Sequence, residues 1–235
     1  MNVLISSAGS ELAQELVKSL SGEHQIRLTD LVEINTNLEF FRNDLDHGKE
    51  TNKLVRGMDT VIHLAQIPPE LLSKSDHPEN LIIDFQTRCS YNLIQAACEE
   101  GVNRIIYASS LRLFDQHEED WAVTEIWRPK PTTDIPVLSS YLGEFVCREF
   151  SRENRIQIFC LRLGKLIRTE PAKTSLFDST WLEMGDAVQA FKCALRSDGG
   201  PWEIFHIQSE FPNARFLIDR AKENLDYKPQ FHIEE

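Results

Sequence analysis

Long apolar segments are missing from this sequence of 235 residues. No run approaches the ~20 apolar residues that a membrane-spanning helix needs. Residues 1–5 carry neither the basic region nor the apolar stretch of a secretory signal. Cysteine is also scarce: the 5 cysteines form an odd set without a C-x-x-C pair, which argues against a disulfide framework or a cysteine zinc site. These absences predict a cytoplasmic protein that does not cross a membrane.

Positive charge is in short supply as well. Lysine and arginine number 25 against 37 aspartate and glutamate residues, so the formal net charge is −12. A net-acidic surface repels nucleic-acid phosphates and anionic lipid headgroups, so neither nucleic acid nor a membrane surface is an expected partner. The 7 histidines are scattered, and none stands at ligand spacing from a cysteine or a carboxylate, so no metal site is predicted.

What is present is an alternation of short apolar runs with helical patterns, which is typical of βαβ units around a parallel sheet. Strands are expected at 3–5, 25–29, 60–65, 104–109, 156–163 and 203–207, and helices at 12–20, 80–100, 138–154, 186–195 and 213–225. Pro129, Pro131 and Pro136 predict a loop. The predicted fold class is α/β, a Rossmann-like doubly wound parallel sheet with a small C-terminal elaboration.

A turn of small residues follows the first expected strand and opens the first expected helix. In dinucleotide-binding folds, the backbone N–H groups of such a turn and the helix N-terminus bind a pyrophosphate. The glycine positions of the G-x-x-G-x-x-G pattern fall at Ser7, Ser10 and Ala13, and none of them is glycine. Small side chains still permit the close approach of a phosphate, although serine at the first position loses the tolerance of glycine for positive φ. An ordinary helix N-cap formed by Ser7 or Ser10, with the Glu11 carboxylate interacting favourably with the helix dipole, is the alternative interpretation. The candidate phosphate-binding residues are Ser7, Gly9, Ser10, Glu11 and Leu12.

Asp30 ends the second expected strand, about 20 residues after the small-residue turn, where a carboxylate binds the adenosine ribose hydroxyls in these folds. Neither Leu31 nor Val32 is an arginine that would pair with a 2′-phosphate, so NAD is predicted in preference to NADP. A solvated carboxylate at a strand end is the alternative interpretation of Asp30. In the next loop, Asp44 and Leu45 are candidates for contacting the adenine edge, although they also fit an ordinary turn.

Several segments resemble the extended short-chain dehydrogenase/reductase family, the NAD-dependent epimerase/dehydratase group. The segment 57–65 (GMDTVIHLA) resembles the third-strand signature of the family, and 101–110 (GVNRIIYASS) resembles the strand that carries its serine or threonine. The segment 86–97 (QTRCSYNLIQAA) is similar to the helix written N-V-x-G-T-x-N-L-L-E-A-A. The segments 180–182 (TWL) and 225–229 (LDYKP) are similar to the uronate dehydrogenases of this family.

The resemblance implies a domain organisation and partners. It implies an NAD(P)-binding Rossmann-like domain over 1–165 and a small substrate-binding part of the same compact unit over 166–235. It also implies a sugar-like substrate and a homodimer formed through the helices at 80–100 and 138–154. The Leu-Ala end of the third-strand signature passes under the cofactor in the family. The candidate cofactor-binding residues therefore include Leu31, Leu64, Ala65 and Gln66 beside Asp30.

Catalysis in this family uses a tyrosine and a serine or threonine. The tyrosine takes the proton of the substrate hydroxyl, with its pKa lowered by a nearby lysine, and the serine or threonine holds that hydroxyl. Ser110 occupies the serine position, with a strand-end cap as its alternative role. Tyr141 is the only tyrosine near the start of the expected helix, and Phe145 stands where the lysine of Y-x-x-x-K belongs.

A second alignment matches Gly143-Glu144 to a G-E pair of the family. It puts Pro136 at the tyrosine position and Ser140 at the lysine position. Under either alignment the lysine is absent. Loss of a charge that shifts a tyrosine pKa by about 1–3 units lowers the amount of active base by roughly 10- to 1000-fold.

Two functions therefore stay open. The first is an NAD-dependent oxidoreductase or epimerase acting on a sugar, sugar acid or nucleotide sugar, with Ser110 and Tyr141 as catalytic residues. The alternative is a catalytically impaired or non-catalytic dinucleotide-binding or interaction protein on the same scaffold. The missing lysine leaves open whether the chain is an enzyme.

Overall fold

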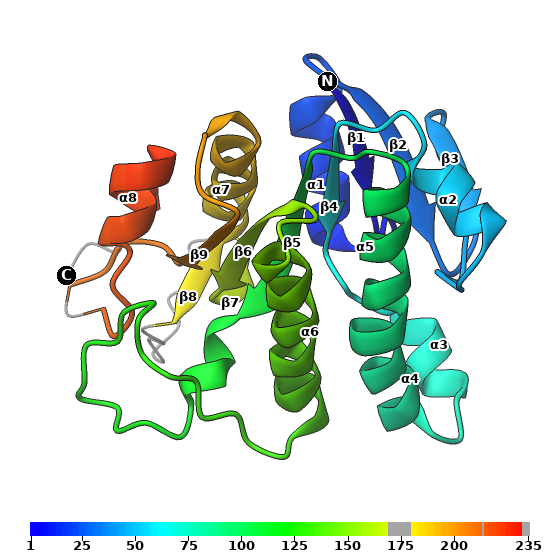
Figure 1. Ribbon diagram of the computed structural model, residues 1–235. Coiled ribbons are helices and arrows are strands. Elements are labelled where there is room, and N and C mark those ends of the chain that lie inside the picture. Colours follow the sequence, from blue (N-terminus) through cyan, green and yellow to red (C-terminus); the bar gives the residue numbers. More distant parts are fainter. Residues whose placement is uncertain (169–179, 213, 232–235) are drawn as a thin grey trace.

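Residues 1–168, 180–212 and 214–231 are described by the structure, a computed structural model (Figure 1). Seven parallel strands form one sheet in the order β3-β2-β1-β4-β5-β6-β9. The strands are β1 Asn2–Ile5, β2 Gln25–Asp30, β3 Glu39–Arg42, β4 Thr60–His63, β5 Arg104–Ser110, β6 Gln157–Leu163 and β9 Trp202–Ile207. A small two-stranded sheet joins β7 Lys165–Ile167 and β8 Trp181–Glu183. The predicted α/β class with a parallel sheet is confirmed.

The order of the strands reverses at β1. The chain runs outward through β2 and β3, then returns to the other side of β1 as β4 and continues outward through β5 and β6. In such doubly wound sheets, ligands bind in the crevice at the carboxyl ends of the strands where the order reverses. The topology therefore places a candidate site beyond the ends of β1, β2 and β4.

Helices cover both faces of the sheet. They are α1 Glu11–Leu20, α2 Lys49–Val55, α3 Pro69–Lys74, α4 Pro78–Asp84, α5 Ser90–Glu99, α6 Ile135–Arg152, α7 Met184–Arg196 and α8 Asp219–Leu225. One face carries α1 and α7, and the other carries α2, α5 and α6 (Figure 1). No helix in the described ranges is long and apolar enough to cross a membrane.

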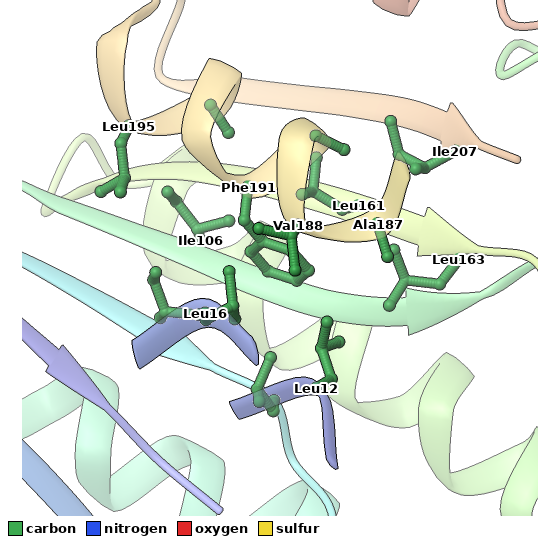
Figure 2. Packing of buried hydrophobic residues seen from close by; sticks show 14 of the residues in the cluster. Leu12, Leu16, Ile106, Leu161, Leu163, Ala187, Val188, Phe191, Leu195 and Ile207 are labelled. Carbon is green, nitrogen blue, oxygen red and sulfur yellow. The ribbon is translucent and has the colours of Figure 1, made fainter. Parts of the chain in front are cut away.

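The alternation of side chains along the strands divides the core into two layers. Successive side chains of a strand point to opposite faces of the sheet, and accordingly Val3 and Ile5 pack with α1 whereas Leu4 packs with α2 and α5. Figure 2 shows the α1 layer, where side chains of α1, among them Leu12, and of α7, among them Phe191, belong to one cluster over the central strands. Both helices are amphipathic, so burial of their apolar faces fixes α1, and with it the turn that precedes it.

The C-terminal part of the chain completes this same sheet. β9 pairs with β6 from Ile158↔Trp202 to Leu163↔Ile207, and α7 packs with α1 in one hydrophobic cluster. The predicted substrate-binding part 166–235 thus shares both a sheet and a core with the predicted domain 1–165.

Three predicted elements need correction. The helix expected at 80–100 consists of α4, a π-helical segment Phe85–Cys89 and α5, because the π-turn accommodates an extra residue. Pro136 lies in the first turn of α6 rather than in the loop, since a missing N–H costs no hydrogen bond there. The last helix begins at Asp219, because residues 215–217 run alongside Val123 and exchange backbone hydrogen bonds with it. Asn213, the first residue of the expected helix, lies outside the described residues.

Candidate functional site

A cavity of about 970 Å³ opens at the carboxyl ends of β1, β2 and β4. Its wall is formed by the turn after β1 and the start of α1, by the residues after β2 and β4, and by residues 166–168. This is the position at which doubly wound sheets bind dinucleotides.

The turn between β1 and α1 keeps a glycine-type backbone without a glycine at its first position. Ser7 has a φ of 55°, in the left-handed region that costs a non-glycine residue about 1–2 kcal/mol. The Oγ of Ser7 accepts a hydrogen bond of 3.0 Å from the N–H of Gln66, and the N–H of Ala8 donates to the carbonyl of Thr29 at 3.1 Å. The expected effect of serine on this turn is therefore wrong: Ser7 adopts the positive φ, with hydrogen bonds on both sides of the turn holding it.

Ser10 caps α1, since its Oγ accepts a hydrogen bond of 3.3 Å from the N–H of Ala13. The N-cap interpretation of Ser10 is thus confirmed. Capping is compatible with phosphate binding, because the first turn of a helix has further N–H groups without intrahelical partners and carries the positive end of the dipole. Ser10, Glu11 and Leu12 all line the cavity, so this end of α1 borders it.

Asp30 lies at the end of β2, directly beneath the turn. One carboxylate oxygen accepts the N–H of Gly9 at 2.8 Å, and the other accepts the N–H groups of Leu31 at 2.6 Å and Val32 at 3.4 Å. A Cβ at position 9 would lie only 3.3 Å from Asp30 Oδ2. Because glycine has no Cβ, the backbone of Gly9 can approach the carboxylate closely. Burial raises the pKa of Asp30, although the backbone N–H groups and especially that of Gly9 oppose the shift. The alternative of a solvated carboxylate is wrong, because only 4% of Asp30 is exposed.

The predicted cofactor-binding residues divide into two groups. Those that line the cavity are Ser7, Gly9, Ser10, Glu11, Leu12, Asp30 and Gln66. Those that do not border it are Leu31, Asp44, Leu45, Leu64 and Ala65. Members of the second group support the first: the N–H of Leu64 donates to Ser6 Oγ at 3.1 Å, and the N–H of Leu31 holds Asp30. Sequence reasoning missed further lining residues, among them Glu33, Glu70 and Arg168, which follow strands without any motif of their own.

A buried histidine ties the turn to α5. His63 Nδ1 lies 2.8 Å from Ser6 Oγ, and its Nε2 lies 2.9 Å from Ser90 Oγ. Ser90 Oγ donates to the carbonyl of Phe85 at 3.1 Å, so it accepts from Nε2–H while Nδ1 accepts from Ser6. Burial lowers the pKa of His63 to about 3, so the ring is neutral and serves as a structural link.

The two predicted catalytic residues border different hollows. Ser110 caps the short helix Leu111–Phe114, since its Oγ accepts the N–H of Arg112 at 3.2 Å; the cap interpretation is confirmed. It lines a hollow of about 910 Å³ together with Lys165 and Arg215. Tyr141 lines another hollow, of about 490 Å³, beside the loop that carries Trp127. Among the described residues no hydrogen bond joins Ser110 to Tyr141, which packs on the apolar cluster that contains Leu111, and their catalytic roles stay predictions.

A model of the NAD dependent epimerase/dehydratase family matches residues 8–180. The chain belongs to this family. It is 22% identical to the uncharacterised protein YtbQ of Bacillus subtilis, over 99% of this chain and 95% of that protein. It is 23% identical to the uronate dehydrogenase of Pseudomonas syringae pv. tomato, over 97% of this chain and 81% of that enzyme. Its fold is similar to that of a mutant uronate dehydrogenase from Agrobacterium tumefaciens complexed with NAD, with a TM-score of 0.84, 20% identity, and coverage of 98% of this chain and 85% of that one.

Helix α6 departs from the Y-x-x-x-K pattern of the epimerase/dehydratase family at the lysine position, where either alignment of the helix places Phe145 or Ser140. Pro136, Ser140 and Glu144 recur every four residues and therefore share one face of the helix. Glu144 faces the sheet, where it contacts Ser109, and it lines the hollow beside Trp127 together with Tyr141. Ser140 Oγ donates to the carbonyl of Pro136 at 2.8 Å. None of these three residues carries a phenol or an ammonium group.

The chain has 4 tyrosines, all in its described part, and none lines the cavity or the hollow beside Ser110. Tyr107 and Tyr227 are fully buried, and the Tyr227 hydroxyl donates to the carbonyl of Gln208 at 2.9 Å. Tyr91 lies exposed on α5. Tyr141 packs against the apolar cluster around Phe114. None of the four tyrosines therefore borders the cavity, which is where the catalytic tyrosine of the epimerase/dehydratase family is expected.

A buried ion pair joins α6 to the sheet. Arg162 Nε and Nη2 each donate to a different carboxylate oxygen of Glu144, both at 2.8 Å, and Ser109 Oγ donates to Glu144 Oε1 at 2.6 Å. The side chains of the pair are 3% and 6% exposed. Sequence reasoning missed this contact, although an arginine inside the apolar strand 157–163 signals a buried partner.

Proposed function

We propose that this protein binds NAD(H) in the cavity at the carboxyl ends of β1, β2 and β4. The observation that carries the proposal is the carboxylate of Asp30, which backbone N–H groups fix at the end of β2 while it lines the cavity. A carboxylate in this position accepts the adenosine ribose hydroxyls. The turn at Ser7 and the start of α1 would hold the pyrophosphate. The NAD complex of a uronate dehydrogenase mutant with the same fold supports this assignment.

The charges around the cavity favour NAD over NADP. Glu33 and Glu70 line the cavity together with Asp30, and the charge of Glu70 contributes to the raised pKa of Asp30. A 2′-phosphate on the adenosine ribose would add two negative charges close to these carboxylates.

Titration calorimetry of the purified protein with NAD⁺, NADH and NADP⁺ tests the proposal. We expect NAD⁺ or NADH to bind with a dissociation constant on the order of 1–100 μM, within the ordinary range for small ligands, and NADP⁺ to bind at least about tenfold more weakly because of charge repulsion. A folded sample that gives no heat with any of the three would contradict the proposal. The search for a ligand would then turn to protein partners.

We infer further that the protein is a catalytically impaired or non-catalytic member of its family. Bound NAD⁺ supplies a hydride acceptor, but hydride transfer from an alcohol also needs a base for the hydroxyl proton. In the alignment through Gly143-Glu144, Pro136 and Ser140 stand at the positions of the base and its lysine. Tyr141 borders neither the cavity nor the hollow beside Ser110, so that base is lacking.

Oxidation or epimerisation of a sugar, sugar acid or nucleotide sugar is the second candidate function. The hollow beside Ser110 favours it, because Arg112, Lys165 and Arg215 contribute cationic groups to its wall and such groups attract a carboxylate. In this function, Ser110 would hold the substrate hydroxyl and Tyr141 would take its proton.

Reduction of NAD⁺ in the presence of uronic acids distinguishes the two functions. We expect a rate at least about 1000-fold below the ~10 s⁻¹ that is typical of enzymes, and no further loss in Tyr141→Phe. Tyr91→Phe, at an exposed position of α5, is the matched control. A rate near 10 s⁻¹ that both Tyr141→Phe and Ser110→Ala abolish would instead establish the second candidate.

A further inference from the structure

An arginine lies beside the N-terminus of α1. Arg168 follows β7, and its Nε contacts Glu11 Oε2 at 3.1 Å while its Nη1 contacts Glu15 Oε1 at 3.6 Å. Glu11 and Glu15 stand one turn apart on α1, so the guanidinium lies along the first turns of this helix. Arg168 also lines the cavity proposed for NAD(H).

The cavity poses an electrostatic problem for a pyrophosphate. Carboxylates of Glu11, Asp30, Glu33 and Glu70 all line it, and the pyrophosphate of NAD brings two more negative charges. Glu11 is the most critical of them, because its carboxylate stands at the positive end of the α1 dipole, where the phosphates would lie.

Two cations line the cavity among the described residues, Arg168 and Lys18. Lys18 lies in the last turn of α1 and pairs with Glu15 at 2.9 Å. Arg168 is the cation that reaches the first turn of α1. Its position therefore corresponds to the place where charge compensation is needed.

We propose that Arg168 binds the pyrophosphate of NAD(H), and that Glu11 is the counter-ion that holds the guanidinium in place in the free protein. This inference rests on the proposed binding of NAD(H). A guanidinium has five N–H donors in a planar fork that matches phosphate oxygens, so it can contact carboxylate and phosphate together. The pair is exposed, with side chains 55% and 70% accessible, and exposed pairs contribute little stability, so the guanidinium can turn to a phosphate at low cost.

Arg168→Gln tests the assignment, with NAD⁺, ADP and adenosine as ligands and titration calorimetry as the readout. We expect the variant to bind NAD⁺ and ADP about tenfold more weakly, which corresponds to loss of one charge-assisted contact to phosphate, and to bind adenosine unchanged. Arg196→Gln is the matched control: Arg196 pairs with Glu23 at similar exposure (58%) and does not line the cavity. It should bind all three ligands as the unaltered chain does, and thermal unfolding checks that both variants are folded.

Glu11→Gln tests the counter-ion. Removing this carboxylate should strengthen NAD⁺ binding several-fold, and Arg168→Gln in that background should still weaken it about tenfold. The assignment of Arg168 is overturned if Arg168→Gln binds NAD⁺ within twofold of the unaltered chain, or if adenosine is weakened as much as ADP. Unchanged NAD⁺ affinity in Glu11→Gln would overturn the role of Glu11. An unaltered chain that binds no nucleotide would instead overturn the proposed function itself.

Discussion

Replacing Asp30 by asparagine is expected to weaken NAD⁺ binding by about 10- to 150-fold while the protein stays folded. The carboxylate would accept the ribose hydroxyls, and loss of a hydrogen bond to a charged group costs about 1.5–3 kcal/mol. Asparagine keeps the shape of the side chain, but it replaces an acceptor by an NH₂ group in a site where the N–H groups of Gly9 and Leu31 already donate. NADP⁺ should lose much less affinity, because the carboxylate that repels its 2′-phosphate is gone.

Titration calorimetry with both nucleotides measures these changes, and Asp59→Asn is the matched control. Asp59 also accepts a backbone N–H, that of Asn2 at 2.7 Å, but it lies just before β4, at the amino end of the strands and away from the cavity. Equal affinities of Asp30→Asn and Asp59→Asn for NAD⁺ would contradict the ribose contact.

The pH dependence follows from the same carboxyl group. Burial raises the pKa of Asp30, so the folded protein retains this proton to a higher pH than the unfolded chain does. Its contribution to stability is therefore present at low pH and is lost as the pH rises through the folded pKa. NAD⁺ affinity should change in the opposite direction, falling as the pH drops through that pKa, because the ribose hydroxyls donate to the ionised form. Asp30→Asn should flatten this part of both pH profiles.

The parallel sheet could be predicted because its central strands are continuous apolar runs. β1, β4, β5 and β6 are buried on both faces, and such runs are readable without knowing their neighbours. β3, α2 and α3 escaped prediction because they are short and mostly half-buried or exposed, so they have no strong apolar period. β7 and β8 have three residues each, and each pairs with a strand that is distant from it in the sequence.

The candidate site could be predicted only where chain-local patterns define it. The small-residue turn and Asp30 follow from strand ends and spacing, whereas Arg168 reaches α1 from a distant segment that only the tertiary structure brings near. On α6 the difficulty was helical phase. Successive residues are turned by about 100°, so Tyr141 and Ser140 point in different directions, and Tyr141 lines the hollow beside Trp127 but neither the cavity nor the hollow beside Ser110. A match of residue type near the expected position therefore says little about which cavity a side chain reaches.

Removing one partner of the buried pair between Glu144 and Arg162 is expected to have the largest effect on stability. Glu144→Gln or Arg162→Met should each lower the free energy of unfolding by about 3–5 kcal/mol, because the remaining charge or donors stay buried without a counter-ion. For a chain of this size that corresponds to a fall in Tm of roughly 6–20 °C. Chemical denaturation followed by circular dichroism measures the change.

A double replacement separates the pair from the packing around it. Glu144→Leu combined with Arg162→Met removes both charges at similar volume, and it should recover most of the stability that either single replacement loses. Arg56→Gln is the control, since Arg56 forms the same kind of two-point contact with Glu100 but is 64% exposed, and it should change unfolding little. If Glu144→Gln were no more destabilising than Arg56→Gln, the two buried charges would not depend on each other. The expected order, a large single loss that a second replacement reverses, would instead mean that the pair adds little net stability and that each buried charge depends on the other.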